Sequence, residues 1–139
     1  MLSIVYVSSA THLLEDGELV EMLRTCVKNN TRDQITGLLL YKGGNFMQAI
    51  EGPDDAVRAL FERILQDPRH TAVYKLRETP IQQREFSKWS MAFRNVDRLP
   101  PEALAGFSLF LNDEFTADVF RQDPGRAHKL LLMFRENVR

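Results

Sequence analysis

The sequence contains a single cysteine, Cys26, so it cannot form an internal disulfide. It has no run that approaches the roughly 18 apolar residues of a membrane span. The N-terminal segment from Met1 to Tyr6 has no basic stretch leading into a long apolar one, so we expect no secretory signal. His12 and His128 have no metal-ligand spacing with each other or with a carboxylate, so we assign no metal site. These absences predict a soluble, cytoplasmic protein.

The chain also has little net charge, since 18 Lys and Arg residues against 19 Asp and Glu residues leave −1 at pH 7. A whole-chain electrostatic footprint for nucleic acid or for an anionic membrane is therefore missing. A length of 139 residues indicates one domain, large enough to bury a core around one ligand but too short to hold an output enzyme as well. We expect any output to lie elsewhere.

Short apolar runs rich in β-forming residues predict five strands, over residues 2–8, 35–41, 45–50, 72–79 and 87–94. Lys42-Gly43-Gly44 joins the second run to the third, and paired glycines fit the positive φ angles of a tight hairpin. The second and third strands are therefore expected to pair directly.

Two segments between these strands have helical spacing. In the first, which starts at Asp16, apolar residues recur every three or four positions, and Asn29-Asn30 closes it because asparagine tolerates the left-handed conformation. The second starts with Pro53 in its first turn and carboxylates near the positive end of its dipole. Asp67-Pro68 ends it, because proline disfavours α geometry in the residue before it.

This order of elements predicts the fold class α/β (α+β), a ferredoxin-like β-α-β-β-α-β sheet with an extra strand. Both helices cover one face of such a sheet, but the run at 35–41 is apolar on both faces, so the other face needs a cover as well. After Pro100-Pro101, apolar residues recur at the spacing of two or three short amphipathic helices. We therefore expect residues 1–96 to form the main domain and residues 97–139 a helical cap over the opposite sheet face.

Tyr6 and Gln48 are the first candidates for chemistry. Tyr6 shares strand parity with Ile4, and Gln48 shares it with Ile50, so both side chains can point to the helix-covered face. A buried amide without partners costs roughly 1–3 kcal/mol, so Gln48 needs a buried partner or an exposed position. Taken alone, the two residues also fit a core tyrosine with a bonded hydroxyl and a hydrogen-bonded structural glutamine.

Further polar candidates stand where the two helices end. The Asn30 amide offers both a donor and an acceptor, although Asn29 and Asn30 also fit a helix C-cap. The end of the second helix holds a cluster that also fits a solvated helix end: Arg63, Asp67, Arg69 and His70. Further along, Trp89 and Met91 are two residues apart, so one regular strand would place both on the same face.

The joint order and spacing of five elements is more specific than any one of them: Tyr6, Asn29-Asn30, Ile35-Thr36-Gly37, Gln48 within residues 44–52, and Trp89-Ser90-Met91. Together they resemble the BLUF family of blue-light sensors that hold FAD, from about Leu2 to Phe93. The resemblance implies non-covalent FAD in a flavin-binding domain over residues 1–96.

The resemblance also implies roles for the candidates. Asn30, with more weight than Asn29, would bind the pyrimidine edge of the flavin. Arg63, Asp67 and His70 would lie on its ribityl and phosphate side. After blue light, Tyr6 would donate an electron and then a proton by way of Gln48, and the changed hydrogen bonds would shift absorption to the red. Trp89 and Met91 would relay the change to the sheet edge.

By the same resemblance, the protein is a photochemical sensor without substrate turnover that signals to a separate partner or to another copy of itself. A homodimer or higher oligomer fits five phenylalanines that one short helical tail cannot easily bury: Phe107, Phe110, Phe115, Phe120 and Phe134. We expect neither nucleic acid nor membrane as a partner.

Two other functions share the expected strand order. An acylphosphatase-like hydrolase uses an arginine in the anion-binding loop after its first strand, and residues 8–13 here contain none. An RNA-recognition module stacks bases on aromatic residues of an open sheet face amid basic residues, a set that Phe46 and Tyr6 could mimic. The near-neutral charge and the apolar C-terminal segment argue against such an open face.

Overall fold

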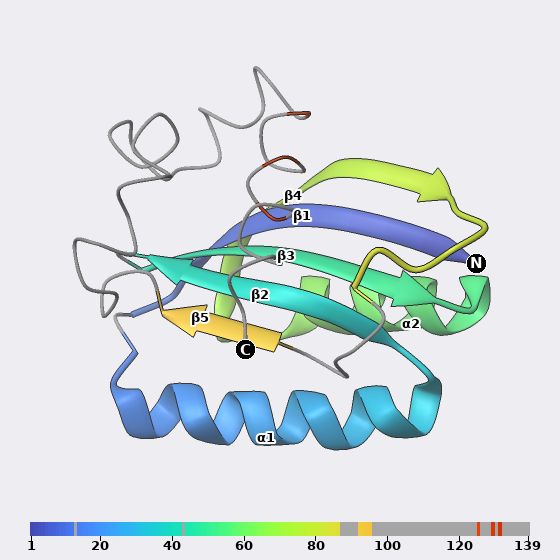
Figure 1. Ribbon diagram of the computed structural model, residues 1–139. Coiled ribbons are helices and arrows are strands. Elements are labelled where there is room, and N and C mark those ends of the chain that lie inside the picture. Colours follow the sequence, from blue (N-terminus) through green and yellow to red (C-terminus); the bar gives the residue numbers. More distant parts are fainter. Residues whose placement is uncertain are drawn as a thin grey trace.

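The computed structural model describes residues 1–12, 14–42, 44–86 and 92–95, together with residues 125, 129 and 131 (Figure 1). In these ranges the chain forms five strands and two helices: β1 (Leu2–Ala10), α1 (Asp16–Asp33), β2 (Thr36–Lys42), β3 (Asn45–Gly52), α2 (Asp54–Gln66), β4 (His70–Pro80) and β5 (Ala92–Asn95). This confirms the ferredoxin-like order with one extra strand.

The five strands form one sheet in the order β4-β1-β3-β2-β5. β1 pairs antiparallel with both β3 and β4, and β2 pairs antiparallel with β3. β5 lies parallel to β2 and is the added edge strand. The expected hairpin joins β2 to β3, and Gly44 has the positive φ of 81° that such a turn needs.

Both helices pack on one face of the sheet (Figure 1). The core on that side joins residues of one strand parity, among them Ile4, Tyr6 and Ile50, to residues of α1 and α2 such as Met22 and Phe61. The sheet face away from the helices is buried as well, since six residues of the opposite parity are at most 3% exposed: Val5, Val7, Leu38, Leu40, Met47 and Ala49. Both faces are therefore buried, as the unbroken apolar run in β2 predicts.

The end of α1 corrects one prediction. Asn29 and Asn30 do not close the helix, which continues to Asp33; the residue in the left-handed conformation is Gln34, with φ of 61°. The backbone N–H groups of Gln34 and Ile35 donate to the Asn30 carbonyl, so Asn30 belongs to the helix proper. Tertiary placement of the Asn30 side chain thus overrides the local preference of asparagine for a helix end.

Smaller differences concern β1 and the two edge strands, β4 and β5. β1 runs to Ala10, and β4 starts at His70 rather than at residue 72. Its pairing with β1 shifts register at two places, and Ala72, which lies at the second of them, has a φ of 51°, which marks a bulge. The expected fifth strand at 87–94 is observed only as β5, because residues 87–91 lie outside the described ranges.

Nearly all of the predicted C-terminal cap lies outside the described residues, as does the boundary at residues 96 and 97. The three residues described there are helical, and one of them, Leu131, is fully buried. A buried leucine so far along the chain fits a cap that packs on the main domain, and the division at residue 96 stays a prediction.

Candidate functional site

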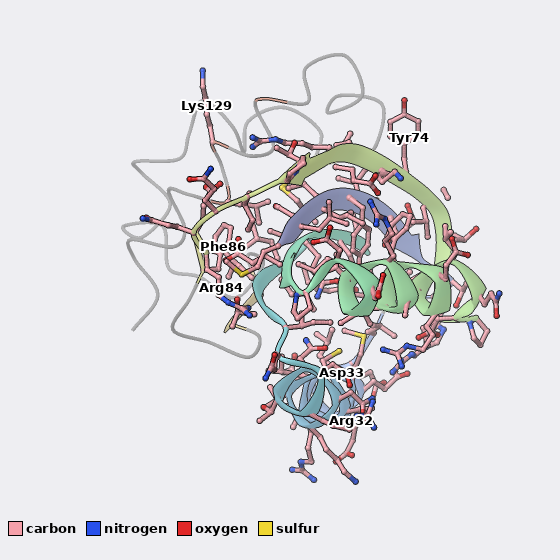
Figure 2. All side chains as sticks on the ribbon, turned by 90° about the vertical axis from the view of Figure 1, so that its right-hand side faces the viewer. Arg32, Asp33, Tyr74, Arg84, Phe86 and Lys129 are labelled. Carbon is pink, nitrogen blue, oxygen red and sulfur yellow. The ribbon has the colours of Figure 1, made fainter. Side chains whose placement is uncertain are left out.

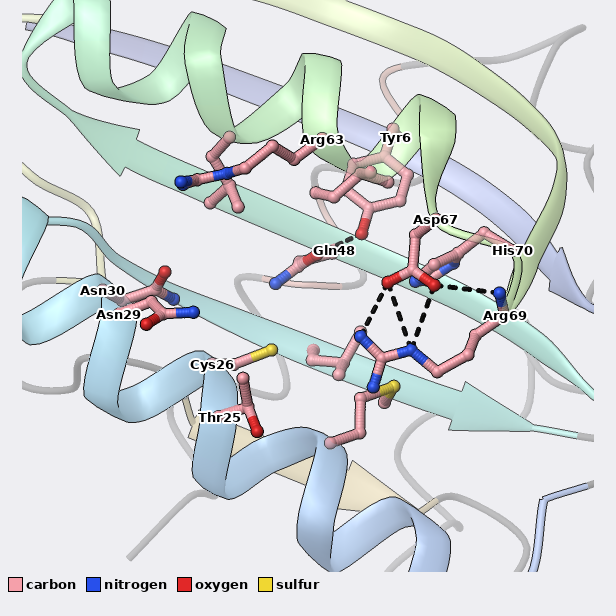
Figure 3. Close-up of a pocket in the computed structure, with 14 residues that line it drawn as sticks. Tyr6, Thr25, Cys26, Asn29, Asn30, Gln48, Arg63, Asp67, Arg69 and His70 are labelled. Atoms are coloured by element: carbon pink, nitrogen blue, oxygen red, sulfur yellow. Dashed lines mark hydrogen bonds and ion pairs between the residues drawn. The ribbon is translucent and has the colours of Figure 1, made fainter.

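Tyr6 and Gln48 are direct neighbours on β1 and β3, where they are paired across the antiparallel ladder. Their exposed fractions are 1% and 4%. The Tyr6 hydroxyl donates a hydrogen bond to Oε1 of Gln48 (Figure 3). The predicted parity is therefore confirmed, and each side chain satisfies a buried polar atom of the other.

Burial, with smaller contributions from Cys26 and Asp67, raises the pKa of Tyr6 far above its ordinary value of 10.0. The phenol therefore keeps its proton at neutral pH and remains a hydrogen-bond donor. Gln48 in turn presents an amide that can accept from the phenol and donate elsewhere. A phenol that can lose an electron and an amide that can pass a proton thus lie in direct contact.

These two side chains stand at the floor of a cavity between α1 and α2 (Figure 3). Its volume is about 210 Å³, several times the share of roughly 30 Å³ that one water occupies in the liquid. The cavity can therefore take an organic group. The residues that line it are Tyr6, Met22, Thr25, Cys26, Asn29, Asn30, Leu39, Gln48, Leu60, Arg63, Ile64, Asp67, Arg69 and His70.

One end of the cavity is rich in amides. Asn30 is only 2% exposed, and its side chain comes from α1 toward Gln48, with Asn29 beside it (Figure 3). Primary amides present donors and acceptors side by side, which complements the alternating carbonyl and N–H groups of an imide edge. This end therefore suits a flat heterocycle with such an edge.

The other end carries charge. Arg69 and Asp67 form a close ion pair in which Arg69 Nη2 lies 2.6 Å from Asp67 Oδ2. The hydrogen bonds from Arg69 hold the pKa of Asp67 below its ordinary value. His70 lies beside this pair, and its Nδ1 is 2.9 Å from Ser8 Oγ. Burial lowers the pKa of His70, so the ring is neutral at neutral pH.

Arg63 links the two walls. It reaches from α2 along the amide end of the cavity, and its Nη2 lies 3.5 Å from Asp33 Oδ2 at the end of α1. Since its side chain is 53% exposed, the guanidinium can also meet a charged group at the cavity mouth. All predicted site residues within the described ranges line this one cavity.

Sequence reasoning missed part of the lining. Cys26 and Met22 precede Asn30 by four and eight positions, so helical periodicity alone would have placed all three on one face. The sequence places Arg69 only in a cluster at the end of α2, and its ion pair with Asp67 fixes its position in the cavity wall. Trp89 and Met91 lie outside the described residues.

The residues fit a flavin as ligand. Apolar walls from Leu39, Leu60 and Ile64 suit an aromatic ring system, the amides suit its pyrimidine edge, and Arg63 suits a phosphate. The fit rests on this donor set and on the burial of Asn30 and Gln48 at the amide end.

Fold and site together define a ferredoxin-like domain in which a buried phenol and a buried amide line a ligand-sized cavity. Residues 1–92 match the BLUF family, described as sensors of blue light using FAD. The chain belongs to this family, and FAD is the cofactor by which the family is defined. Membership favours a light sensor over an acylphosphatase-like hydrolase, and the two buried sheet faces argue against an RNA-recognition module.

Individual relatives agree with the family match. The chain is 40% identical over 98 residues to the photoactivated adenylate cyclase subunit beta of Euglena gracilis, an alignment that covers 70% of this chain and 11% of that protein. It superimposes on the dark-state structure of BlrB, a BLUF protein, with a TM-score of 0.80 and 30% identity, covering 99% of this chain and 96% of that one.

A bacterial light-regulated adenylyl cyclase gives a TM-score of 0.75 at 30% identity, covering 96% of this chain but 36% of the cyclase. The chain spans about a tenth of the length of these curated cyclases, so their catalytic activity does not transfer with the match. Among the described residues, no helix has the length and apolar character to cross a membrane, and no three metal-ligating side chains gather.

Proposed function

We propose that this protein is a blue-light photoreceptor that binds FAD non-covalently between α1 and α2 and signals through a light-induced change of hydrogen bonds. The observation that carries the proposal is the Tyr6 hydroxyl donating to Gln48 at the floor of a cavity that Asn30 lines. Bound FAD supplies the absorption of blue light and a strong excited-state oxidant. All later steps depend on the side chains around it.

In this mechanism, Tyr6 would give an electron to the excited flavin and then its proton, which would pass through the Gln48 amide. The electron and the proton would both return to Tyr6, so no substrate would be consumed and no covalent bond to the protein would form. Gln48 would be left rotated or tautomerised, and its stronger hydrogen bond to the cofactor would shift absorption to the red. The result is a population shift that another surface must read.

The remaining cavity residues bind and orient the cofactor. Asn30, with Asn29 beside it, holds the pyrimidine edge, which its burial and its place next to Gln48 support. Arg63, Asp67 and His70 serve the ribityl and phosphate side. Trp89 and Met91 relay the change to the sheet edge at β5, a role carried over from the family resemblance.

The first experiment is the absorption spectrum of the purified full chain in the dark and under blue light. We expect a yellow protein that releases intact FAD on denaturation, and a reversible shift of the flavin band to the red on illumination. A colourless protein that takes up no flavin on reconstitution would refute the proposal.

We further propose that the chain turns over no substrate and acts on a separate protein, as a homodimer or higher oligomer. The relatives support an effector outside this fold: one solved structure is a light-regulated adenylyl cyclase, and an Escherichia coli relative is a blue light- and temperature-regulated antirepressor. Light scattering of the FAD-loaded chain in the dark and in blue light, alone and with cell extract, tests this. A monomer in both states with no light-dependent partner contradicts it.

Two finer statements belong to the same proposal. Residues 1–96 form the flavin-binding domain, and residues 97–139 cap the opposite sheet face, which the burial of Leu131 supports. The protein acts in the cytoplasm, a reducing compartment that suits the free thiol of Cys26.

A further inference from the structure

Arg84 ties the chain after β4 to one corner of the sheet. Its guanidinium donates to three oxygens: the Gln34 carbonyl at 2.7 Å, Thr36 Oγ1 at 2.9 Å and the Glu51 carbonyl at 3.1 Å. At this corner α1 leads into β2, and β3 leads into α2. The planar guanidinium of Arg84 therefore bridges the α1–β2 and β3–α2 connections.

Glu51 holds the same segment from inside the sheet. It is fully buried, and its Oε1 accepts a hydrogen bond from the Phe86 backbone N–H at 2.5 Å. The Phe86 side chain is itself 1% exposed, and Figure 2 shows it next to Arg84. Within the described part of the chain, Oε2 of Glu51 is buried without a hydrogen-bond partner. A buried carboxyl oxygen without a partner lowers the stability of the fold, so stabilisation alone does not explain the presence of Glu51 at this position.

The corner is joined through the backbone to residues that line the cofactor cavity, although neither Glu51 nor Arg84 lines it. Glu51 follows Gln48 by three residues on β3 but has the opposite parity, so its carboxyl lies on the sheet face away from the cavity. Gln34, which Arg84 contacts, is the left-handed residue that ends the helix carrying Asn30.

The backbone at this corner is also tightly packed. A Cβ built on Gly52 would lie 2.7 Å from the Gln34 carbonyl oxygen and 3.4 Å from Ile35 Cα. The backbones of the α1–β2 turn and the end of β3 are thus in tight contact, so a shift in one displaces the other.

We propose that Glu51 and Arg84 form a clamp that holds residues 84–86 on this corner and thereby couples the hydrogen-bond state of Gln48 and Asn30 to the chain leading into β5. Both act as positioning residues, because neither lines the cofactor cavity. The inference rests on the proposed photoreceptor function. It adds a structural connection through which a change at Gln48 or Asn30 in the cavity reaches the far face of the sheet.

The test is hydrogen exchange of the FAD-loaded full chain in the dark and in blue light, read together with the flavin spectrum. Glu51→Leu removes the acceptor for the Phe86 amide. We expect it to keep FAD and the red shift, to speed dark exchange at residues 84–86 on the order of tenfold, and to abolish the light–dark difference in exchange there.

Two variants control this experiment. Glu51→Gln keeps an acceptor oxygen of the same size and is expected to restore both the slow exchange and its light–dark difference. Glu62→Leu removes a carboxylate from the exposed face of α2 and is expected to change neither. If Glu51→Leu does not fold, Arg84→Lys replaces it, since an ammonium cannot reach all three oxygens with the geometry of the guanidinium.

Three results overturn the clamp. The first is unchanged dark exchange at residues 84–86 in Glu51→Leu. The second is faster exchange spread evenly over β1, β2 and β3, which indicates a merely structural role. The third is a wild-type protein with a normal red shift but no light–dark difference at residues 84–86. Failure of the proposed function looks different, because the wild type then shows no flavin band or no red shift at all.

Discussion

Tyr6 differs from Tyr41, the other buried tyrosine of the core, in what its hydroxyl contacts. Tyr6 donates to the Gln48 amide in the cavity, whereas the Tyr41 hydroxyl accepts from the Leu14 backbone N–H at 3.2 Å and lines no part of the cavity. Two residues of the same type in one core therefore have separable roles. This provides a matched pair for the photochemistry.

We predict that Tyr6→Phe keeps FAD but loses the red-shifted light state, because the ring still packs while the phenolic donor is gone. Gln48→Leu is expected to lose it as well, since the amide relay is removed. Tyr41→Phe loses one hydrogen bond, worth about 1 kcal/mol of stability, and is expected to photocycle normally. The measurement is the light-minus-dark absorption spectrum, and a normal red shift in Tyr6→Phe would show that the relay is wrong.

Asn29 and Asn30 form a second matched pair. Asn30 is buried at the amide end of the cavity, while Asn29 is partly exposed. We predict that Asn30→Ala weakens FAD binding by about tenfold or more, the factor for roughly 1.4 kcal/mol of lost hydrogen bonding, and that Asn29→Ala weakens it less. Alanine suits both helical positions, so the fold is expected to persist. Fluorescence titration of the apoprotein with FAD measures both affinities, and equal losses would contradict the assignment to Asn30.

At the scale of elements, the end of β3 is set by what cannot fit there. Gly52 faces the Gln34 carbonyl so closely that any side chain would force the backbone to move, whereas Gly17 in the first turn of α1 has nothing within 4 Å of its added Cβ. The two glycines are therefore present for different reasons. Only that at position 52 is required by packing.

We predict that Gly52→Ala lowers the free energy of unfolding by about 1–3 kcal/mol, because it overpacks a backbone contact. Gly17→Ala is expected to raise it by about 0.5–1 kcal/mol, because alanine loses less conformational entropy in a helix. Urea denaturation of both variants beside the wild type measures the difference. Similar midpoints for the two variants would show that the corner adapts at little cost.

Elements whose signals are local were predictable from the sequence. Strand parity placed Tyr6 and Gln48 correctly, because one face of each strand must meet the helices, and Pro68 marked the end of α2 to within two residues. The prediction that Asn29-Asn30 ends α1 was wrong because the left-handed residue is Gln34, a residue type with no strong preference for that conformation. The bulged register of β4 depends on its pairing with β1, which no local pattern encodes.

Contacts between distant segments were not predictable from one sequence. Glu51 and Phe86 are separated by 35 positions, and nothing near Phe86 marks it as the partner of a buried carboxyl. One signal was available: Glu51, like Gln48, is a polar residue in an apolar strand and so needs a buried partner.

At the scale of the whole molecule, the buried carboxyl of Glu51 links folding to pH. Burial raises its pKa above the ordinary 4.5, and the backbone amides of Phe86 and Glu85 offset only part of that effect. Arg84 further lowers this pKa and Glu85 raises it. Well below pH 4.5 the group is protonated in both the folded and the unfolded chain, so it causes no pH dependence there.

We predict that the contribution of Glu51 to stability falls as pH rises above 4.5 and levels off once pH passes its folded pKa. The folded chain holds this proton longer than the unfolded chain, so the free energy of unfolding decreases with pH in that window. Asp67 acts in the opposite direction, because its pKa is lowered in the fold. The comparison is therefore the wild type minus Glu51→Gln, measured by urea denaturation from pH 4 to pH 8. Since the glutamine does not titrate, the variant is expected to gain on the wild type as pH rises, and a difference that is flat across this range would show that Glu51 keeps its ordinary pKa in the fold.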